Sequence, residues 1–257
     1  MSASPILAPV PASTPAVIKT SARQPGVLIL DPQALSRAVW WAAAVVVTLG
    51  VLREIALPFI GGNTMLKNLR HFAFDSEHSL PAWLETVQMA AASALLAVRA
   101  ALSHRLDPEN RTHWSLLAIV FFALCIDESV SFHEVTMAPL RQTFNLSGYL
   151  YFSWVLIAAP LVAAFGAYCI PFLLRLPPQV AVRFVIAGAL FVGGAFGLEF
   201  VGGRLVSAGG FDQPAYKLVS TLEEILEITG MALFVTSLIQ HLAACTPRLT
   251  IAFAPRT

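Results

Sequence analysis

The chain has 257 residues, of which 57% are hydrophobic and 12% are charged, and its mean hydropathy is +0.72. Soluble domains carry about 25% charged residues, so this composition predicts a polytopic membrane protein. The net charge of +1 and the lack of a dense basic stretch give no support for nucleic-acid binding. Cys125, Cys169 and Cys245 are scattered and odd in number, so neither a disulfide framework nor a paired-cysteine metal site is expected.

The predicted fold class is all-α, a transmembrane helix bundle of about six spans. Residues 1–32 are rich in Pro, Ala and Ser and predict a disordered cytoplasmic tail. Residues 33–245 form the transmembrane domain, and residues 246–257 a short cytoplasmic tail. A hydrocarbon core of about 30 Å needs about 20 apolar residues per helix. The predicted spans are residues 38–60, 82–102, 114–134, 150–174, 180–206 and 215–242.

Most of the 16 Lys and Arg residues fall on one side of these spans, with the tail, the turns at residues 107–110 and 177–178, and the C-terminus. The positive-inside rule then predicts that both termini are cytoplasmic. The expected location is the inner (plasma) membrane of a bacterial cell. The fourth span has no charged residue between Leu150 and Leu174, so it is predicted to be peripheral and to face lipid.

The acidic residues of the second, third, fifth and sixth spans are predicted to lie toward the extracytoplasmic ends of these spans. A lone ionised carboxylate near the bilayer centre costs about 2.5–3.5 kcal/mol on insertion scales, so these acids need partners, protons or a metal. At 100° per residue, the three glutamates of the sixth span share one helix face. In the third span Asp127, Glu128 and Glu134 share a face, whereas His133 projects away if the helix continues that far. We therefore predict a carboxylate-lined cavity that opens to the extracytoplasmic side.

Carboxylates with an imidazole suit iron, zinc or manganese, so a divalent metal is the expected cofactor. The lipid bilayer is the expected partner, and a lipid or amphiphile the expected substrate of a metal-dependent membrane hydrolase or oxidase. One alternative is a cation- or proton-coupled transporter. Another is a structural or accessory subunit, in which the acids pair with Arg53, Arg204 and Lys217. The predicted metal ligands are Glu85, Asp127, Glu128, His133, Glu134, Glu199, Glu223, Glu224 and Glu227.

Three motifs carry a resemblance to known families. Asp-Glu-x4-His-Glu, Gly-x-Glu-x-x-Gly-Gly and Glu-Glu-x-x-Glu together resemble a set of uncharacterised bacterial multi-span membrane proteins. The resemblance implies one shared site and identifies no reaction. The residues that carry it are Asp127, Glu128, His133 and Glu134; Gly197, Glu199, Gly202 and Gly203; and Glu223, Glu224 and Glu227.

Two further resemblances concern metal chemistry. Glutamates that line a helix bundle are similar to the ligands of di-iron carboxylate proteins, although those carry Glu-x-x-His twice and this chain has Glu-x-x-Glu. The step from Ser129 to His133 resembles the Ser-x-x-x-His of alkaline ceramidases and adiponectin receptors. The second half of those zinc hydrolases carries a His-x-x-x-His, which has no counterpart in this chain because His241 stands alone.

Overall fold

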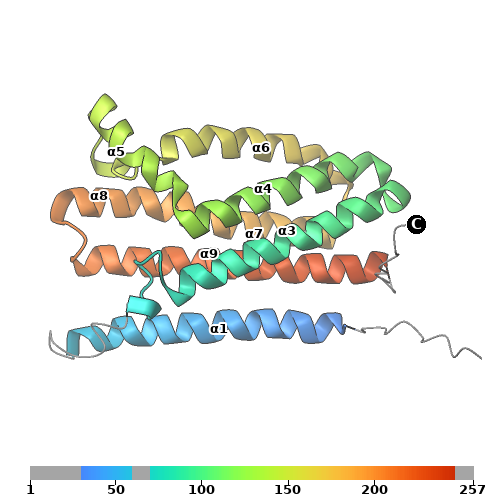
Figure 1. Cartoon of the computed structure of the whole chain (residues 1–257), viewed down its shortest axis with the longest axis horizontal. Coiled ribbons are helices and arrows are strands. Elements are labelled where there is room, and N and C mark those ends of the chain that lie inside the picture. Colours follow the sequence, from blue (N-terminus) through green and yellow to red (C-terminus); the bar gives the residue numbers. More distant parts are fainter. Residues whose placement is uncertain (1–29, 60–69, 247–257) are drawn as a thin grey trace, which may run out of the picture.

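The computed structural model describes residues 30–59 and 70–246, and in these ranges the chain forms helices and no strands. Six helical segments are long and apolar enough to cross a membrane, and they lie side by side as a bundle (Figure 1). The prediction of an all-α, six-span bundle is confirmed. The two predicted tails lie almost entirely outside the described residues. The six segments are α1 (Pro32–Ala56), α3 (Leu80–Leu106), Pro108–Val130 with α4 (Arg111–Val130), α6 (Val155–Arg175), Pro178–Gly209, and α9 (Pro214–Cys245).

Helix α9 is the central helix of the bundle. In its most apolar stretch 56% of the residues are buried, against 11% in α6, which lies along one edge (Figure 1). A Cβ at Gly230 of α9 would lie 2.8 Å from the carbonyl oxygen of Ala187 and 2.9 Å from the nitrogen of Phe191. Small residues permit such close helix contacts in membranes. The exposure of α6 agrees with the predicted peripheral place of the fourth span.

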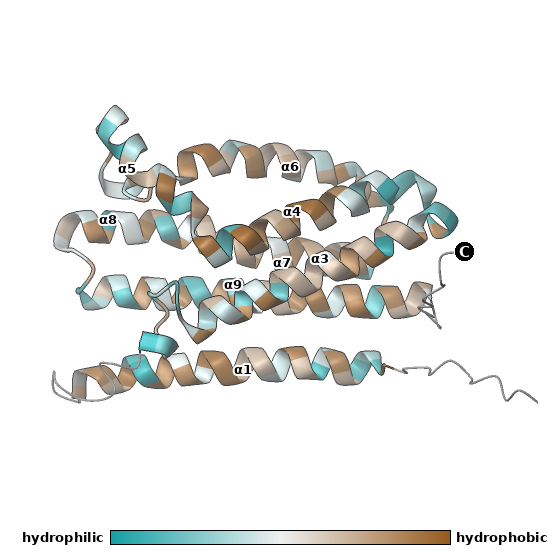
Figure 2. Cartoon of the chain, viewed as in Figure 1, coloured by the Kyte–Doolittle hydropathy of each residue, from teal (hydrophilic) through white to brown (hydrophobic). Residues whose placement is uncertain are grey.

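The middle of the bundle is an apolar core. Phe234 of α9 stacks on Phe121 of α4, with ring centroids 4.7 Å apart, and contacts Phe184 at 4.8 Å. Leu96 and Leu238 are completely buried in the same cluster. Figure 2 shows the hydrophobic segments between more polar ends of the helices. This core separates the polar groups at one end of the bundle from those at the other.

The fifth span is interrupted by a π-helix. It consists of α7 (Pro178–Val192), the π-helical segment η5 (Gly193–Leu198) and α8 (Glu199–Gly209). In a π-helix the backbone hydrogen bonds span five residues instead of four, which widens the turn. Such segments occur often at functional sites. Here the segment directly precedes Glu199, one of the predicted ligands.

The third span ends earlier than predicted. Helix α4 stops at Val130, and Ser131 adopts a left-handed conformation with φ of 53°. The next residue starts a separate helix, α5 (Phe132–Phe144). The predicted helical phase beyond Val130, which placed Glu134 with Asp127 and turned His133 away, is therefore wrong. The turn at Ser131 redirects the chain and brings His133 back toward the end of α4.

Polar groups also meet at the opposite end of the bundle. The buried guanidinium of Arg99 contacts the Oγ of Ser103 at 2.6 Å, an oxygen of Asp107 at 3.2 Å and the Nε2 of His241 at 3.4 Å. It also lies 4.7 Å from the ring centroid of Trp114. This network ties α3 to α4 and α9.

Candidate metal centre at the acidic end

Helices α3 and α9 begin, and helices α4 and α8 end, on one side of the bundle, which we call the acidic end (Figure 1). Glu85 lies in the second turn of α3, and Asp127 and Glu128 lie in the last turn of α4. Glu199 is the first residue of α8, and three glutamates lie near the start of α9. The alternating direction of the helices thus places acids from distant parts of the sequence at one end.

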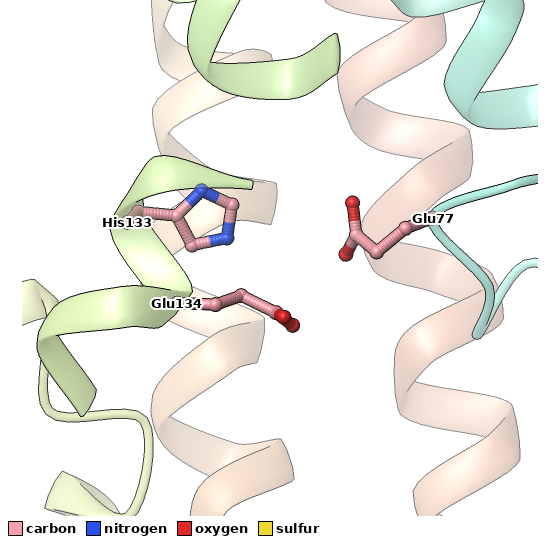
Figure 3. Close-up of side chains that lie close together, drawn as sticks. All are labelled: Glu77, His133 and Glu134. Atoms are coloured by element: carbon pink, nitrogen blue, oxygen red, sulfur yellow. The ribbon is translucent and has the colours of Figure 1, made fainter. Parts of the chain in front are cut away.

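Three side chains at this end form a compact group, which we call the surface triad: Glu77, His133 and Glu134. One ligand atom from each lies within 4.8 Å of the others, and no other such group occurs among the described residues. Figure 3 shows Glu77, from the loop before α3, facing His133 and Glu134 at the start of α5. Both glutamates are exposed, and His133 is half-buried. The triad therefore lies at the surface of the bundle.

The imidazole of His133 is held by Asp127. Its Nδ1 lies 2.9 Å from one carboxylate oxygen of Asp127, and its backbone N–H donates to the other oxygen at 2.9 Å. A metal-bound histidine typically donates its second ring nitrogen to a carboxylate, which fixes the tautomer and the ring orientation. With Nδ1 occupied in this way, Nε2 is the nitrogen that remains to bind a metal. Ser131 donates a 3.1 Å hydrogen bond to Glu77 and so connects the loop to the same turn.

The charge state of His133 depends on this pairing. Burial lowers the pKa of His133, whereas the hydrogen bond and the charge of Asp127, together with the charges of Glu77 and Glu128, raise it. The raising effects are larger in sum, so the pKa of His133 lies above its usual value. A raised folded-state pKa stabilises the fold at pH values below the ordinary histidine pKa of about 6.5, while Asp127 is ionised. This stabilisation is lost as the pH rises through the raised pKa.

Replacing Asp127 with asparagine tests the role of this pair. We expect the pKa of His133 to fall in Asp127→Asn, and the affinity of the triad for metal to drop about 10–100-fold. An NMR titration of the imidazole measures the first effect, and competition with a metal-binding dye measures the second. An unchanged pKa and an unchanged affinity would show that Asp127 does not support His133.

Six glutamates lie deeper in the bundle, and we call them the interior glutamates. In the described part of the chain none of them forms an ion pair with Lys or Arg, because the ion pairs there involve other acids. They interact electrostatically with one another instead. The predicted partner Arg53 pairs with Glu54, and the ion pairs of the described residues include neither Arg204 nor Lys217. The interior glutamates are Glu85, Glu128, Glu199, Glu223, Glu224 and Glu227.

One pair of interior glutamates is linked to the surface triad. The carboxyl groups of Glu199 and Glu223 interact with each other. Glu199 also accepts a 2.9 Å hydrogen bond from the indole of Trp154. The same indole lies 5.1 Å from the imidazole of His133, measured between ring centroids. Trp154 therefore joins the surface triad to the interior glutamates.

The π-helical segment provides room for another interior glutamate. A Cβ at Gly194 would lie 2.8 Å from the Cγ of Glu227 and 2.9 Å from the carbonyl oxygen of Glu223. Glu227 therefore packs directly on the backbone of the fifth span. Glycine at position 194 permits this approach, since any side chain there would push α9 away.

Two members of the site have no sequence signal that identifies them. Glu77 lies in a loop, to which no helical periodicity applies, so nothing in the sequence specifies its partners. A tryptophan near the end of a span is typical of an anchor at the membrane interface. The indole hydrogen bond of Trp154 depends on how the segment before α6 approaches α8, and no sequence pattern indicates this.

The fold and the site together define a multi-pass α-helical membrane protein with a carboxylate-rich end. A family described as "Domain of unknown function (DUF8692)" matches residues 38–242, and the chain belongs to this family. No curated protein and no solved structure matches the chain. Any functional assignment therefore depends on the chemistry of the site.

Proposed function

We propose that this protein binds a divalent metal at the surface triad and catalyses a metal-dependent reaction on a lipid or another amphiphile. The observation that supports the proposal most strongly is the approach of Glu77, His133 and Glu134 to within 4.8 Å, with Asp127 behind the imidazole. The positive-inside rule supports an extracytoplasmic location for this end at the inner membrane, with both termini in the cytoplasm.

The donor set fits iron, zinc or manganese. One imidazole nitrogen and two carboxylates leave open positions for water and substrate, as catalytic metal sites require. The bound metal would act as a Lewis acid and lower the pKa of a coordinated water. The protein supplies the orientation of His133 through Asp127 and the position of Glu77 through Ser131.

An amphiphilic substrate is favoured by the helix that carries two of the ligands. Helix α5 has no buried residue and exposes large apolar side chains on either side of His133 and Glu134. Phe132 is 61% exposed and Val135 69% exposed. A short helix of mixed polarity at the end of a bundle is suited to lie in the membrane interface. A lipid could then reach the triad from the bilayer.

The transporter alternative is less well supported. A transported ion needs a polar route through the whole bundle. Between Glu227 and the polar network around His241, helix α9 contributes the buried residues Ile228, Met231 and Val235 to the apolar core. The structural-subunit alternative loses support because the interior glutamates lack ion-pair partners among the described residues.

Metal analysis of the purified full-length protein tests the proposal. We expect stoichiometric metal in the wild-type protein and loss of the triad-bound ion in Glu77→Gln, because this variant removes one of three ligands without changing the size of the side chain. Asp212→Asn, an exposed acid in the loop before α9, is the matched control and should retain the ion. A wild-type protein that binds no metal after reconstitution with iron, zinc or manganese would overturn the proposal.

A further inference from the structure

Three side chains on α3 and α9 have buried polar atoms without hydrogen-bond partners. Glu85 is 1% exposed, and its Oε1 atom has no partner among the described residues. Gln88, one turn further along α3, is 4% exposed, and neither its amide oxygen nor its amide nitrogen has a partner. The Oε2 atom of Glu224 on α9 is also buried without a partner. Helices α3 and α9 pack against each other, and Glu85 and Glu224 interact electrostatically across them.

Unsatisfied groups of this kind are costly. A buried donor or acceptor without a partner costs about 1–3 kcal/mol, and a charged group costs more. Buried polar groups in native proteins therefore almost always have a partner, which is protein, ordered water or an ion. The partner of Glu85 has to be found outside the side chains of the described residues.

The electrostatic surroundings indicate the sign of that partner. The charged groups that interact with Glu85 are Glu227, Glu224, Glu128 and Glu223, and all of them are acids. Glu224 faces a similar set, which includes Glu128 and Glu77. A water molecule would satisfy hydrogen bonds, but it would leave the repulsion between these carboxylates whenever they are ionised. A cation satisfies both the oxygens and the charges.

We infer that a hard divalent cation binds between α3 and α9, where Glu85, Glu224 and Glu227 supply carboxylate oxygens and Gln88 supplies an amide oxygen. This inner site is separate from the surface triad and has only oxygen donors, so it suits Mg²⁺, Ca²⁺ or Mn²⁺. Such ions retain coordinated water. Side chains that bind an ion through coordinated water lie further from one another than side chains that coordinate it directly, as those of the triad would.

The inner site is connected to the surface triad through Glu128. This carboxylate interacts with Glu77, His133 and Asp127, and it also acts on Glu85, Glu224 and Glu227. The acidic end would therefore hold two cations, one at the surface with a histidine ligand and one in the interior with oxygen ligands. The inner cation would reduce the repulsion that the interior glutamates exert on one another.

A titration of the metal-depleted full-length protein with Mn²⁺ tests the inference, with bound ions counted by elemental analysis and by the loss of the free-ion signal in electron paramagnetic resonance. We expect two ions per chain in the wild type, and one in Glu85→Gln and in Glu224→Gln. The single ion that remains in Glu85→Gln should be lost on adding His133→Ala. Glu109→Gln, at an exposed position at the opposite end, is the matched control and should bind two.

The outcomes separate the inner site from the triad. If the wild type binds one ion that His133→Ala removes and Glu85→Gln retains, the inner site is refuted and the triad stands. If it binds one ion that Glu85→Gln removes and His133→Ala retains, the inner site stands and the proposed function fails. Ion counts that are unchanged in Glu85→Gln and Glu224→Gln also overturn the inner site. Retention of the triad ion in Glu85→Gln shows that this variant is folded.

Discussion

Replacing His133 with alanine is expected to abolish metal binding at the surface triad. His133 is the only nitrogen donor of the group, and the two remaining ligands are exposed glutamates on different segments. Loss of a supporting residue typically weakens metal affinity about 10–100-fold, so loss of the ligand itself should cost more than about 100-fold. Isothermal titration with Zn²⁺ measures the change, and any activity that depends on the triad should disappear with the ion.

His78→Ala provides the control for this variant. His78 lies in the same loop as Glu77, is exposed and does not belong to the triad. Its replacement should leave the Zn²⁺ affinity within a factor of about two of the wild type, because surface substitutions without specific contacts have small effects. Equal affinities for His133→Ala and His78→Ala would exclude His133 as a ligand.

Replacing Gly194 with alanine is expected to destabilise the protein and to disturb the interior glutamates. The new Cβ would lie 2.8 Å from the Cγ of Glu227 and 2.9 Å from the carbonyl oxygen of Glu223. A side chain can rotate away, but a backbone carbonyl cannot, so α9 has to shift. Overpacking of this kind costs about 1–3 kcal/mol. Thermal unfolding in detergent measures the loss of stability, and Mn²⁺ titration measures the effect on cation binding.

Two glycines in the same π-helical segment serve as controls. A Cβ at Gly193 or Gly197 would have no atom of the described residues within 4 Å outside its own stretch of helix. Glycine-to-alanine changes at unstrained helical positions stabilise proteins by about 0.4–1 kcal/mol. Gly193→Ala and Gly197→Ala should therefore stabilise the protein, whereas Gly194→Ala destabilises it. If Gly194→Ala were as stable as Gly197→Ala, the close packing of Glu227 on η5 would be refuted.

The positions of the spans could be predicted because hydropathy over about 20 residues is a strong signal. The gathering of Glu85, Glu199 and Glu227 at one end then follows from the alternating direction of consecutive helices. Neither step requires knowledge of side-chain contacts. The helical phase in α9 was also accessible, since Glu223, Glu224 and Glu227 lie in one uninterrupted helix.

The surface triad could not be predicted because it depends on a single backbone conformation. Ser131 ends α4 at φ of 53°, although its flanking sequence contains neither glycine nor proline. Non-glycine residues rarely adopt this conformation, and a continued helix was the reasonable expectation. The turn determines which way His133 points and so brings it to Asp127. Glu77 joins from a loop, to which no periodic pattern applies.

The inner site and the π-helical segment depend on contacts between helices. Gln88 has no distinguishing sequence pattern, and its two atoms without partners are recognised only in the packed bundle. The glycines of Gly193–Leu198 are typical of close helix packing in membranes, but nothing in this stretch specifies a widened turn. The same holds for Arg99, since its network is formed with His241, which is 142 residues away in the sequence.

X-ray absorption at the metal edge of the zinc- or iron-loaded protein tests the central claim most directly. The surface triad predicts a spectrum with one imidazole nitrogen among oxygen ligands, and the imidazole contribution should vanish in His133→Ala. A spectrum without an imidazole ligand in the wild-type protein, or one that is identical in His133→Ala, would contradict a metal centre built on Glu77, His133 and Glu134.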